Sequence, residues 1–526
     1  MRIRRRILFA FIVTIVSGAN ILIYSPSYSK SHLLLNGRIA DTLSRAAHNV
    51  VMFIPEYAVT DYNGTQIAKT IYMRAISDAF AHLLARISDT FFESQIWALQ
   101  EMEGWAYTCS NMCEAILHRK DELEQLRKYK FDVGFSEQLD LCGAGIIRYL
   151  GIPTHIWLSS GPIYESIGYL LGVPTPLSYV PIAENADLSV RMSFMERAFN
   201  FYLWLREIYF HRLETNLSTE KFRQLVNANF PHLRDIAAES ALCFVYSDEF
   251  LDVTRPILHK TVYVGGFGIS PQPSSLQEPF SSMMQKGNEG VILMSFGTVV
   301  PSSSLPSNVR KDFFKVFAEF SDYHFLVRIS SDDEESRQLA KYIRNVDLLE
   351  WMPQMDILGH PRLRLFIMHG GQRGILESTI RGTPLLVVPF FVDQFRNARN
   401  VEYRGIGLSL QKHEINFEEL KKKLHELLEN DKYSKAVRRL SSMIHNKPNK
   451  PEEQIVKWTN FVAEFGPLPE LTVEGAKFNF IKYFCLDVIL VVFLALFAAL
   501  MTLILAVRWV MAQFRSNVHN VSKKIA

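Results

Sequence analysis

Short apolar runs alternate with helix-like patterns over the first 265 residues of the chain. Segments 33–46 and 143–150 carry apolar residues at helical spacing, which predicts two helices. Predicted strands lie at residues 21–24, 48–54, 131–135, 154–158, 242–246 and 261–265. Since strands that alternate with helices form parallel sheets with helices on both faces, this half of the chain is predicted to be an α/β domain.

The same alternation begins again after a stretch rich in Pro and Ser at residues 269–282. The second set of predicted strands lies at residues 291–296, 324–329, 348–351, 365–369 and 385–389. We therefore predict an α/β fold with two tandem doubly wound, Rossmann-like domains that face each other across a cleft. The domains span residues 20–265 and 290–447, and a linker at 266–289 joins them. Ligands of such sheets bind at the carboxyl ends of the strands, so the site is expected in the cleft.

The beginning of the chain is typical of a secretory signal peptide at residues 1–19. The basic start at 1–6 precedes an apolar run at 7–16 and the small residues Ser17 and Ala19, the order found in signal peptides. The alternative is an uncleaved anchor helix, although the run is short for a bilayer. In both cases the chain is expected to enter the secretory route.

A second apolar segment, at residues 488–507, contains no charge and as a helix would span the roughly 30 Å core of a bilayer. We predict a transmembrane helix at 484–507, preceded by helical segments at 448–483. The predicted cytosolic tail at 508–526 contains four cations, Arg508, Arg515, Lys523 and Lys524. The positive-inside rule then predicts a single-pass type I topology.

Signals of the secretory route lie at other places in the chain. The terminal Lys523-Lys524-Ile525-Ala526 resembles the dilysine signal that returns type I proteins to the endoplasmic reticulum, an address that is read by a receptor. Asn63 and Asn216 begin glycosylation sequons that we expect in the lumen. The sequence therefore predicts a glycoprotein of the endoplasmic reticulum membrane with both α/β domains in the lumen.

Composition and cysteine count exclude several classes of protein. The net charge is +3 with 21% charged residues, which gives no electrostatic reason to expect a nucleic acid partner. Five cysteines are too few for a disulfide framework, although a bridge between Cys109 and Cys113 remains open. The chain has no CxxC metal spacing, so no structural metal is expected.

The stretch from Trp351 to Gln394 has the most distinctive pattern. It reads Trp-Met-Pro-Gln-Met-Asp-Ile-Leu-Gly-His-Pro at 351–361, Phe-Ile-Met-His-Gly-Gly at 366–371 and Asp-Gln at 393–394. This pattern closely resembles the signature of the UDP-glycosyltransferase family, whose animal members include the UDP-glucuronosyltransferases. The resemblance extends over both domains and the membrane anchor.

The resemblance implies the activity. A metal-independent, inverting displacement would transfer glucuronate or glucose from a UDP-sugar to a hydroxyl of a small lipophilic acceptor, as in xenobiotic metabolism. The UDP-sugar is a co-substrate, and no cofactor is expected. The sequence leaves open the donor sugar, the acceptor and the oligomeric state, including a homo-oligomer.

The residues around His369 are suited to bind a diphosphate. A predicted strand ends at His369, Gly370 and Gly371 let the backbone approach a phosphate, and a helix begins directly afterwards. The helix dipole and His369 are expected to stabilise the UDP leaving group. Further candidate donor-binding residues are Ser295, Gly297, Thr298 and Gly374.

The resemblance also implies which residues bind the uracil, the ribose and the sugar of the donor. It implies that Trp351 stacks on the uracil, with Gln354 nearby, and that Glu377 accepts hydrogen bonds from the ribose hydroxyls. The alternative for Trp351 is a core residue. Asp393 and Gln394 are implied to bind the hydroxyls of the sugar.

One position departs from the family pattern. Many relatives have an Asn that touches the phosphates where this chain has Arg373. Arg373 would either contact the pyrophosphate or point away from it and weaken the site.

His32 is the candidate catalytic base. Transfer to a hydroxyl needs a group that removes the proton, and His suits this role near neutral pH. His32 follows the first predicted strand, and its position matches the catalytic His of the family. A carboxylate would support the imidazolium; the matching residue is Glu137, where mammalian relatives carry Asp, and Asp140 is a second candidate.

The sequence allows two alternatives to a glycosyltransferase. A catalytically silent ligand binder or partner subunit with the same fold is supported by Arg373 and Glu137 alone. A nicotinamide-dependent dehydrogenase is disfavoured because no GxGxxG lies between the first strand and helix.

Overall fold

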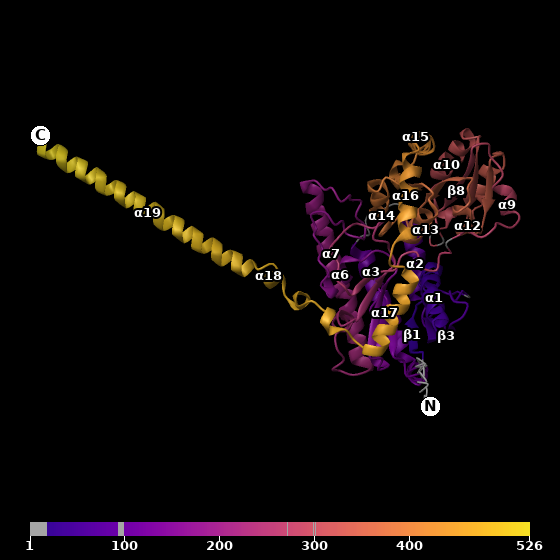
Figure 1. Ribbon diagram of the computed structural model, residues 1–526, viewed down its shortest axis with the longest axis horizontal. Helices are drawn as coiled ribbons and strands as arrows, with labels where there is room; N and C mark the ends of the chain where they lie inside the picture. Colours follow the sequence, from indigo (N-terminus) through magenta and orange to yellow (C-terminus); the bar gives the residue numbers. More distant parts are fainter. Residues whose placement is uncertain are drawn as a thin grey trace, which may run out of the picture. The chain divides into compact units, whose positions relative to one another are not determined.

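The computed structural model describes residues 18–60, 62–92, 99–270, 272–297, 299 and 301–525. The chain divides into two compact units, Met1–Thr472 and Val473–Ala526. Most of the predicted signal peptide and the candidate residue Thr298 lie outside the described residues. Both sheets belong to the first unit (Figure 1).

The first domain is built on a seven-stranded sheet in which all neighbouring strands are parallel. Its strands are β1 (Asn20–Tyr24), β2 (Asn49–Pro55), β3 (Lys69–Met73), β4 (Val133–Glu137), β5 (Thr154–Ser159), β6 (Leu242–Val245) and β7 (Thr261–Tyr263). They are arranged in the order β3-β2-β1-β4-β5-β6-β7. The helices of this domain are α1 (Lys30–Arg45), α2 (Ala79–Thr90), α3 (Leu99–His118), α4 (Lys120–Arg127), α5 (Cys142–Tyr149), α6 (Glu165–Leu171), α7 (Phe194–Leu225) and α8 (Leu233–Ala238).

The second domain repeats the plan with a six-stranded parallel sheet in the order β10-β9-β8-β11-β12-β13. Its strands are β8 (Gly290–Ser295), β9 (Tyr323–Arg328), β10 (Val346–Leu349), β11 (Leu363–Met368), β12 (Leu385–Val387) and β13 (Gly407–Ser409). The linker contains α9 (Phe280–Met283), and the helices that follow are α10 (Ser307–Glu319), α11 (Glu334–Ala340), α12 (Gln354–Leu358), α13 (Gln372–Arg381), α14 (Gln394–Tyr403), α15 (Phe417–Glu429), α16 (Lys432–Asn446) and α17 (Pro451–Phe465). α17 returns to the first domain and packs on α1 (Figure 1).

Burial of the central strands explains why the sequence pattern predicted them. Every residue of β4, β5, β6 and β8 is buried, because helices cover both faces of each parallel sheet. Such strands appear in the sequence as continuous apolar runs. The predicted doubly wound fold is therefore confirmed, and each strand predicted from the sequence is present.

The sequence missed two strands, β3 and β13. β3 pairs only with β2 at the edge of its sheet and is half-exposed over most of its length, so no apolar run marks it. β13 is three residues long and begins with Gly407, which is too short to show a period.

The second unit contains α18 (Phe480–Tyr483) and α19 (Leu486–Ile525). Residues Leu486–Arg515 of α19 form a helix that is long and apolar enough to cross a membrane. This segment contains the predicted stretch at 488–507 and is a candidate membrane span.

The cysteine pairing differs from the one left open by the sequence. Cys113 on α3 is bonded to Cys142, the first residue of α5, with the two Cα atoms 5.6 Å apart, whereas Cys109 is a free, buried thiol. The spacing of Cys109 and Cys113 only places them on one helix. It gives no sign that α3 packs against α5, which is what selects Cys142.

Removing the Cys113–Cys142 bridge should destabilise the first domain. The bridge closes a sequence separation of 29 residues, and loops of that size give a stabilisation of about 2–4 kcal/mol. We expect the double variant Cys113→Ala/Cys142→Ala to lower the thermal unfolding midpoint of the detergent-solubilised protein by several degrees. Cys109→Ala is the control and should lower it less; equal losses in the two variants would contradict a stabilising role for the bridge.

Candidate active site

His32 and Glu137 meet at the carboxyl edge of the first sheet. β1 and β4 are parallel neighbours, so the segments that follow them begin at the same edge. Glu137 is the last residue of β4, and His32 lies in the first turn of α1 rather than in a loop before it. The Nδ1 atom of His32 is 3.1 Å from Oε1 of Glu137.

The contact defines the tautomer of the imidazole. An ionised carboxylate can only accept a hydrogen bond, so Nδ1 of His32 carries the hydrogen and Nε2 keeps its lone pair. The side chain of His32 is 21% exposed and that of Glu137 is 1% exposed. The ring of His32 therefore remains partly accessible, whereas the carboxylate beside it is shielded from water.

Burial lowers the pKa of His32. The charge of Glu137, its hydrogen bond and the charge of Asp393 all raise this pKa, and together they outweigh burial, so the pKa of His32 is raised. Asp393 belongs to the second domain. The electrostatic coupling thus joins the candidate base to a candidate donor-binding residue across the two domains.

Asn36 holds the Glu137 carboxylate in place. Its Nδ2 donates to Oε1 of Glu137 over 3.1 Å and to Oγ of Ser25 over 2.8 Å. The sequence reading missed Asn36, although a signal was available: it lies four residues after His32, and residues at that spacing share a helix face.

The structure places Asp140 away from His32. Asp140 accepts hydrogen bonds from the Tyr28 hydroxyl, from the Tyr57 hydroxyl over 2.9 Å and from the backbone N–H of Cys142 over 2.9 Å. Glu137, not Asp140, is the carboxylate in contact with His32. Asp140 instead fixes an aromatic cluster whose member Tyr28 packs edge-on against the His32 ring at 5.8 Å.

In the second domain, His369 follows β11 directly and precedes α13. Gly370 has a φ of +91°, and Gly371 is the N-cap of α13. The ring of His369 lies between two glycines: a Cβ on Gly297 would be 2.9 Å from its Cε1 atom, and one on Gly371 would be 2.7 Å from Nε2. Only glycine leaves room for the ring at both positions.

Burial lowers the pKa of His369 to about 4. The ring is therefore neutral near neutral pH and is a hydrogen-bond donor rather than a cation. Its Nδ1 atom is buried and has no hydrogen-bond partner among the residues that the structure describes. Ser295, at the end of β8, is buried next to this group.

Glu377 is held by two donors. Nε2 of Gln354 donates to its Oε2 atom and Nε of Arg373 to its Oε1 atom, each over 2.8 Å. Trp351 is not a core residue, because its side chain is 70% exposed. The interpretation of Trp351 as core is therefore wrong.

Asp393 and Gln394 begin α14. Oε1 of Gln394 accepts hydrogen bonds from the backbone N–H groups of Phe390 and Phe391, which leaves the NH2 group of Gln394 as the part able to meet a ligand. Burial raises the pKa of Asp393 to about 6, although Asn397 donates to its Oδ2 atom over 2.7 Å.

Three other predicted residues have defined surroundings. Gly374 allows α13 to pack on β11, because a Cβ there would be 2.8 Å from Cε of Met368. The sequon residue Asn216 is exposed on α7, and its side-chain oxygen is 3.0 Å from Nε2 of His232. Asn63 is half-buried in the loop before β3.

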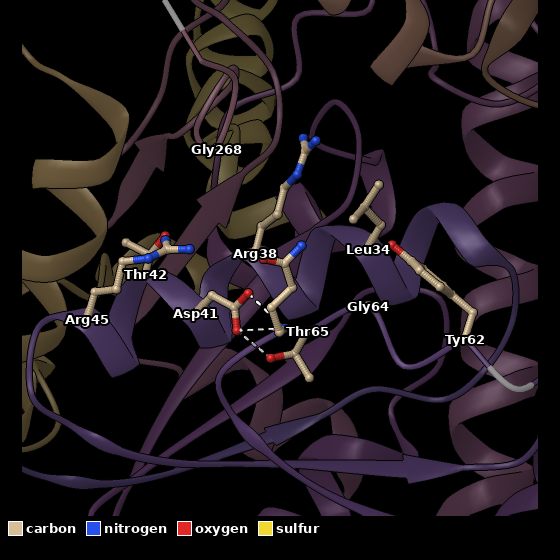
Figure 2. Close-up of a pocket in the computed structure, with 10 residues that line it drawn as sticks. Leu34, Arg38, Asp41, Thr42, Arg45, Tyr62, Gly64, Thr65 and Gly268 are labelled. Atoms are coloured by element: carbon tan, nitrogen blue, oxygen red, sulfur yellow. Dashed lines mark hydrogen bonds between the residues drawn. The ribbon is translucent and has the colours of Figure 1, made fainter. Parts of the chain in front are cut away.

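A separate cavity of about 340 Å³ lies between α1, the loop around Gly64 and the linker at Gly268 (Figure 2). Asp41 is engaged by Thr65 and the backbone of that loop, while the guanidinium of Arg38 extends away from Asp41. None of the predicted site residues lines this cavity.

Comparison with known proteins identifies the family of the chain. The family model described as "UDPGT: UDP-glucoronosyl and UDP-glucosyl transferase" matches residues 19–524. The chain belongs to this family.

Curated relatives of the family cover most of the chain. It is 35% identical over 476 residues to the Caenorhabditis elegans protein named "Putative UDP-glucuronosyltransferase ugt-50", covering 90% of this chain and 91% of that protein. It is 29% identical to UDP-glucuronosyltransferase 3A2 of Mus musculus, covering 93% of each. The resemblance inferred from residues 351–394 is confirmed, and the protein is a glycosyltransferase of the UDP-glucuronosyltransferase type.

Solved structures share the fold at low identity. The chain is similar to the glycosyltransferase of kitacinnamycin, with a TM-score of 0.59 and 17% identity, covering 86% of this chain and all of that one. It is also similar to CalG4, the calicheamicin glycosyltransferase, with a TM-score of 0.58 and 15% identity over the same share of this chain and 100% of the other. Both support the GT-B arrangement of two Rossmann-like domains.

The close approach of Gly371 to His369 gives a test of the donor site. Gly371→Ala would push the His369 ring out of place, and overpacking of this kind costs about 1–3 kcal/mol. We expect the affinity for UDP to fall about tenfold or more, measured by calorimetry on the solubilised protein. Gly104→Ala, whose Cβ would meet only the flexible end of Arg86, is the control and should leave UDP affinity unchanged. An unchanged affinity in Gly371→Ala would contradict a role for this contact.

Proposed function

We propose that the protein transfers the sugar of a UDP-sugar to a hydroxyl group of a small lipophilic acceptor, with His32 as the base. The observation that carries the proposal is the His32–Glu137 pair at 3.1 Å, coupled through charge to Asp393 of the donor-binding domain. An imidazole backed by a buried carboxylate is the arrangement that makes a hydroxyl a nucleophile.

The reaction proceeds in one displacement. Nε2 of His32 takes the proton of the acceptor hydroxyl as its oxygen forms a bond to the anomeric carbon. The bond between that carbon and the β-phosphate oxygen breaks, and UDP leaves with the electron pair. Attack from the face opposite the leaving group inverts the anomeric centre, and Glu137 stabilises the imidazolium that forms.

Residues of the second domain bind the donor. Free N–H groups in the first turn of α13 and the neutral His369 ring donate to the pyrophosphate, where negative charge develops. Glu377 accepts from the ribose hydroxyls, and the exposed Trp351 stacks on the uracil. Asp393 accepts from sugar hydroxyls. In this proposal transfer proceeds without a metal.

The acceptor side of His32 is apolar. Tyr28, Tyr57 and Phe80 pack on one another with ring centroids 5.0–5.7 Å apart, and Tyr28 also contacts the His32 ring. These three rings are buried, so they make the core behind His32 apolar, and an apolar surrounding of the base favours a lipophilic acceptor.

A luminal location in the endoplasmic reticulum is part of the proposal. The Cys113–Cys142 bridge suits an oxidising compartment, and α19 supplies the membrane span of a type I protein. The sequons at Asn63 and Asn216 lie in the same proposed luminal part.

A catalytically silent binder is the second candidate, because Glu377 already has a donor on each oxygen. Incubating purified membranes with UDP-glucose, UDP-glucuronate and a mixed panel of phenols decides between the two. Release of UDP together with a glycosylated phenol, identified by mass, supports the enzyme and also names the donor; retention of both UDP-sugars supports the binder.

Removing the base should separate catalysis from donor binding. We expect His32→Ala to lower kcat by about 10²–10⁴-fold, the usual contribution of a general base, while the Kd for UDP stays within about twofold. His82→Ala, a change at an exposed His on α2, is the control and should retain activity. Full activity in His32→Ala would refute the base assignment.

The pH profile should report the Glu137 contact. Only neutral His32 can accept a proton, so kcat/KM rises as the pH passes through the pKa of His32, which Glu137 holds above its usual value. In Glu137→Gln this support is lost while burial still lowers the pKa, so the acidic limb should move to lower pH and kcat should fall. Asp140→Asn, which leaves the His32–Glu137 contact intact, should keep the limb in place; a shift of equal size there would contradict the assignment.

A further inference from the structure

Arg373 is placed in a way that the family pattern does not explain. It lies in the first turn of α13, where a phosphate would be bound. Its Nε atom instead donates to Oε1 of Glu377, one turn further along the helix, over 2.8 Å. The guanidinium is thus drawn along α13 and away from the free N–H groups at the helix start.

The surroundings of Arg373 strengthen this arrangement. The side chain of Glu377 is 2% exposed and that of Arg373 is 27% exposed. Burial lowers the pKa of Arg373, but the charge of Glu377, its hydrogen bond and the nearby Tyr246 and Tyr62 together outweigh that effect, so the pKa is raised. A contact between two groups that are largely shielded from water is stronger and better fixed than an exposed helical ion pair.

Glu377 is held from both sides. Gln354 donates to Oε2 and Arg373 to Oε1, so the carboxylate cannot rotate without losing a hydrogen bond. A carboxylate has about four lone-pair sites, two on each oxygen. One site on each oxygen therefore remains for a further donor, and the two sites are a fixed distance apart.

We propose that Arg373 is a positioning residue for the nucleotide ribose: together with Gln354 it orients the Glu377 carboxylate so that its two remaining lone pairs meet the two ribose hydroxyls. The inference rests on the proposed function, in which Glu377 binds the ribose. In this role Arg373 neither contacts the pyrophosphate nor weakens the donor site, the two alternatives that the sequence offered.

The proposal predicts that Arg373 affects recognition of hydroxyls but not of phosphates. We compare UDP with 2′,3′-dideoxy-UDP, which keeps the uracil and pyrophosphate but lacks both hydroxyls. The wild-type protein should bind UDP about tenfold or more tightly than the dideoxy compound, since hydrogen bonds to charged groups are each worth about that factor. Binding is measured by calorimetry on the full-length solubilised protein.

In Arg373→Asn, the affinity for UDP should fall about tenfold while that for 2′,3′-dideoxy-UDP stays within about twofold. Arg364→Asn removes the same charge from an exposed position on β11 and should change neither affinity. Equal loss of both nucleotides in Arg373→Asn would make Arg373 a phosphate ligand and overturn the proposal. Unchanged or tighter binding of UDP would overturn it as well.

Arg373→Gln provides a second variant that is neutral but keeps a side-chain N–H donor able to reach Glu377. It should retain at least part of the discrimination between the two nucleotides. If Gln instead weakens both nucleotides to the same extent, the positive charge itself matters and the positioning role is wrong.

Glu377→Gln separates this inference from the function on which it depends. If Glu377 binds the ribose, Glu377→Gln should reduce the discrimination, because one acceptor oxygen is lost, and Glu377→Ala should abolish it. Adding Arg373→Asn to Glu377→Ala should then change the discrimination no further. A wild-type protein that binds both nucleotides equally would remove the ribose assignment of Glu377, and with it the role of Arg373. Transfer activity that depends on His32 would still stand in that case.

Discussion

The site depends on one constraint, the parallel pairing of β1 with β4. Parallel neighbours end at the same edge of a sheet, so the first turn of α1 and the end of β4 must meet although 105 residues separate His32 from Glu137. The same rule applies in the second sheet, where β8 and β11 are neighbours and bring Gly297 against the ring of His369. Two sheets of the same order thus each deliver a histidine to a carboxyl edge. The electrostatic coupling of His32 with Asp393 links these edges.

Buried carboxylates organise the surroundings of both histidines. A carboxylate removed from water is stabilised where donors replace the lost hydration. Two tyrosine hydroxyls donate to Asp140, and Gln354 and Arg373 donate to Glu377. Asn36 and His32 both contact Oε1 of Glu137, whereas its Oε2 atom is buried with no hydrogen-bond partner among the described residues. The donors fix the direction of each carboxylate. Catalytic geometry in this fold is therefore set by residues one layer behind those that would touch substrate, such as Asn36 and Arg373.

The sequence did not predict the contacts made by these supporting residues. The strands buried on both faces were visible as apolar runs, and the signature at 351–394 identified the family and the donor-binding loop. His32 and Glu137 were proposed by resemblance, but the choice between Glu137, at the end of β4, and Asp140, in the loop that follows, depended on which way their side chains point. Nothing in the spacing of Cys109 and Cys113 showed that α3 contacts α5. The sequence also did not predict the partner of Arg373. A cation in the first turn of a helix can contact either a bound phosphate or a carboxylate four residues later on the same helix.

The two histidines have environments that shift their pKa values in opposite directions, which fits the different roles proposed for them. Glu137 raises the pKa of His32, whereas burial lowers that of His369 to about 4. Protonating His369 near pH 7 would need roughly 3 pH units, or about 4 kcal/mol, of extra stabilisation from the bound diphosphate. The N–H groups at the start of α13 need no such change, since their dipoles are already oriented toward the place where charge develops. With Arg373 engaged by Glu377, the proposed mechanism therefore relies mainly on the backbone of α13 to stabilise the leaving group, with one hydrogen bond from the neutral His369.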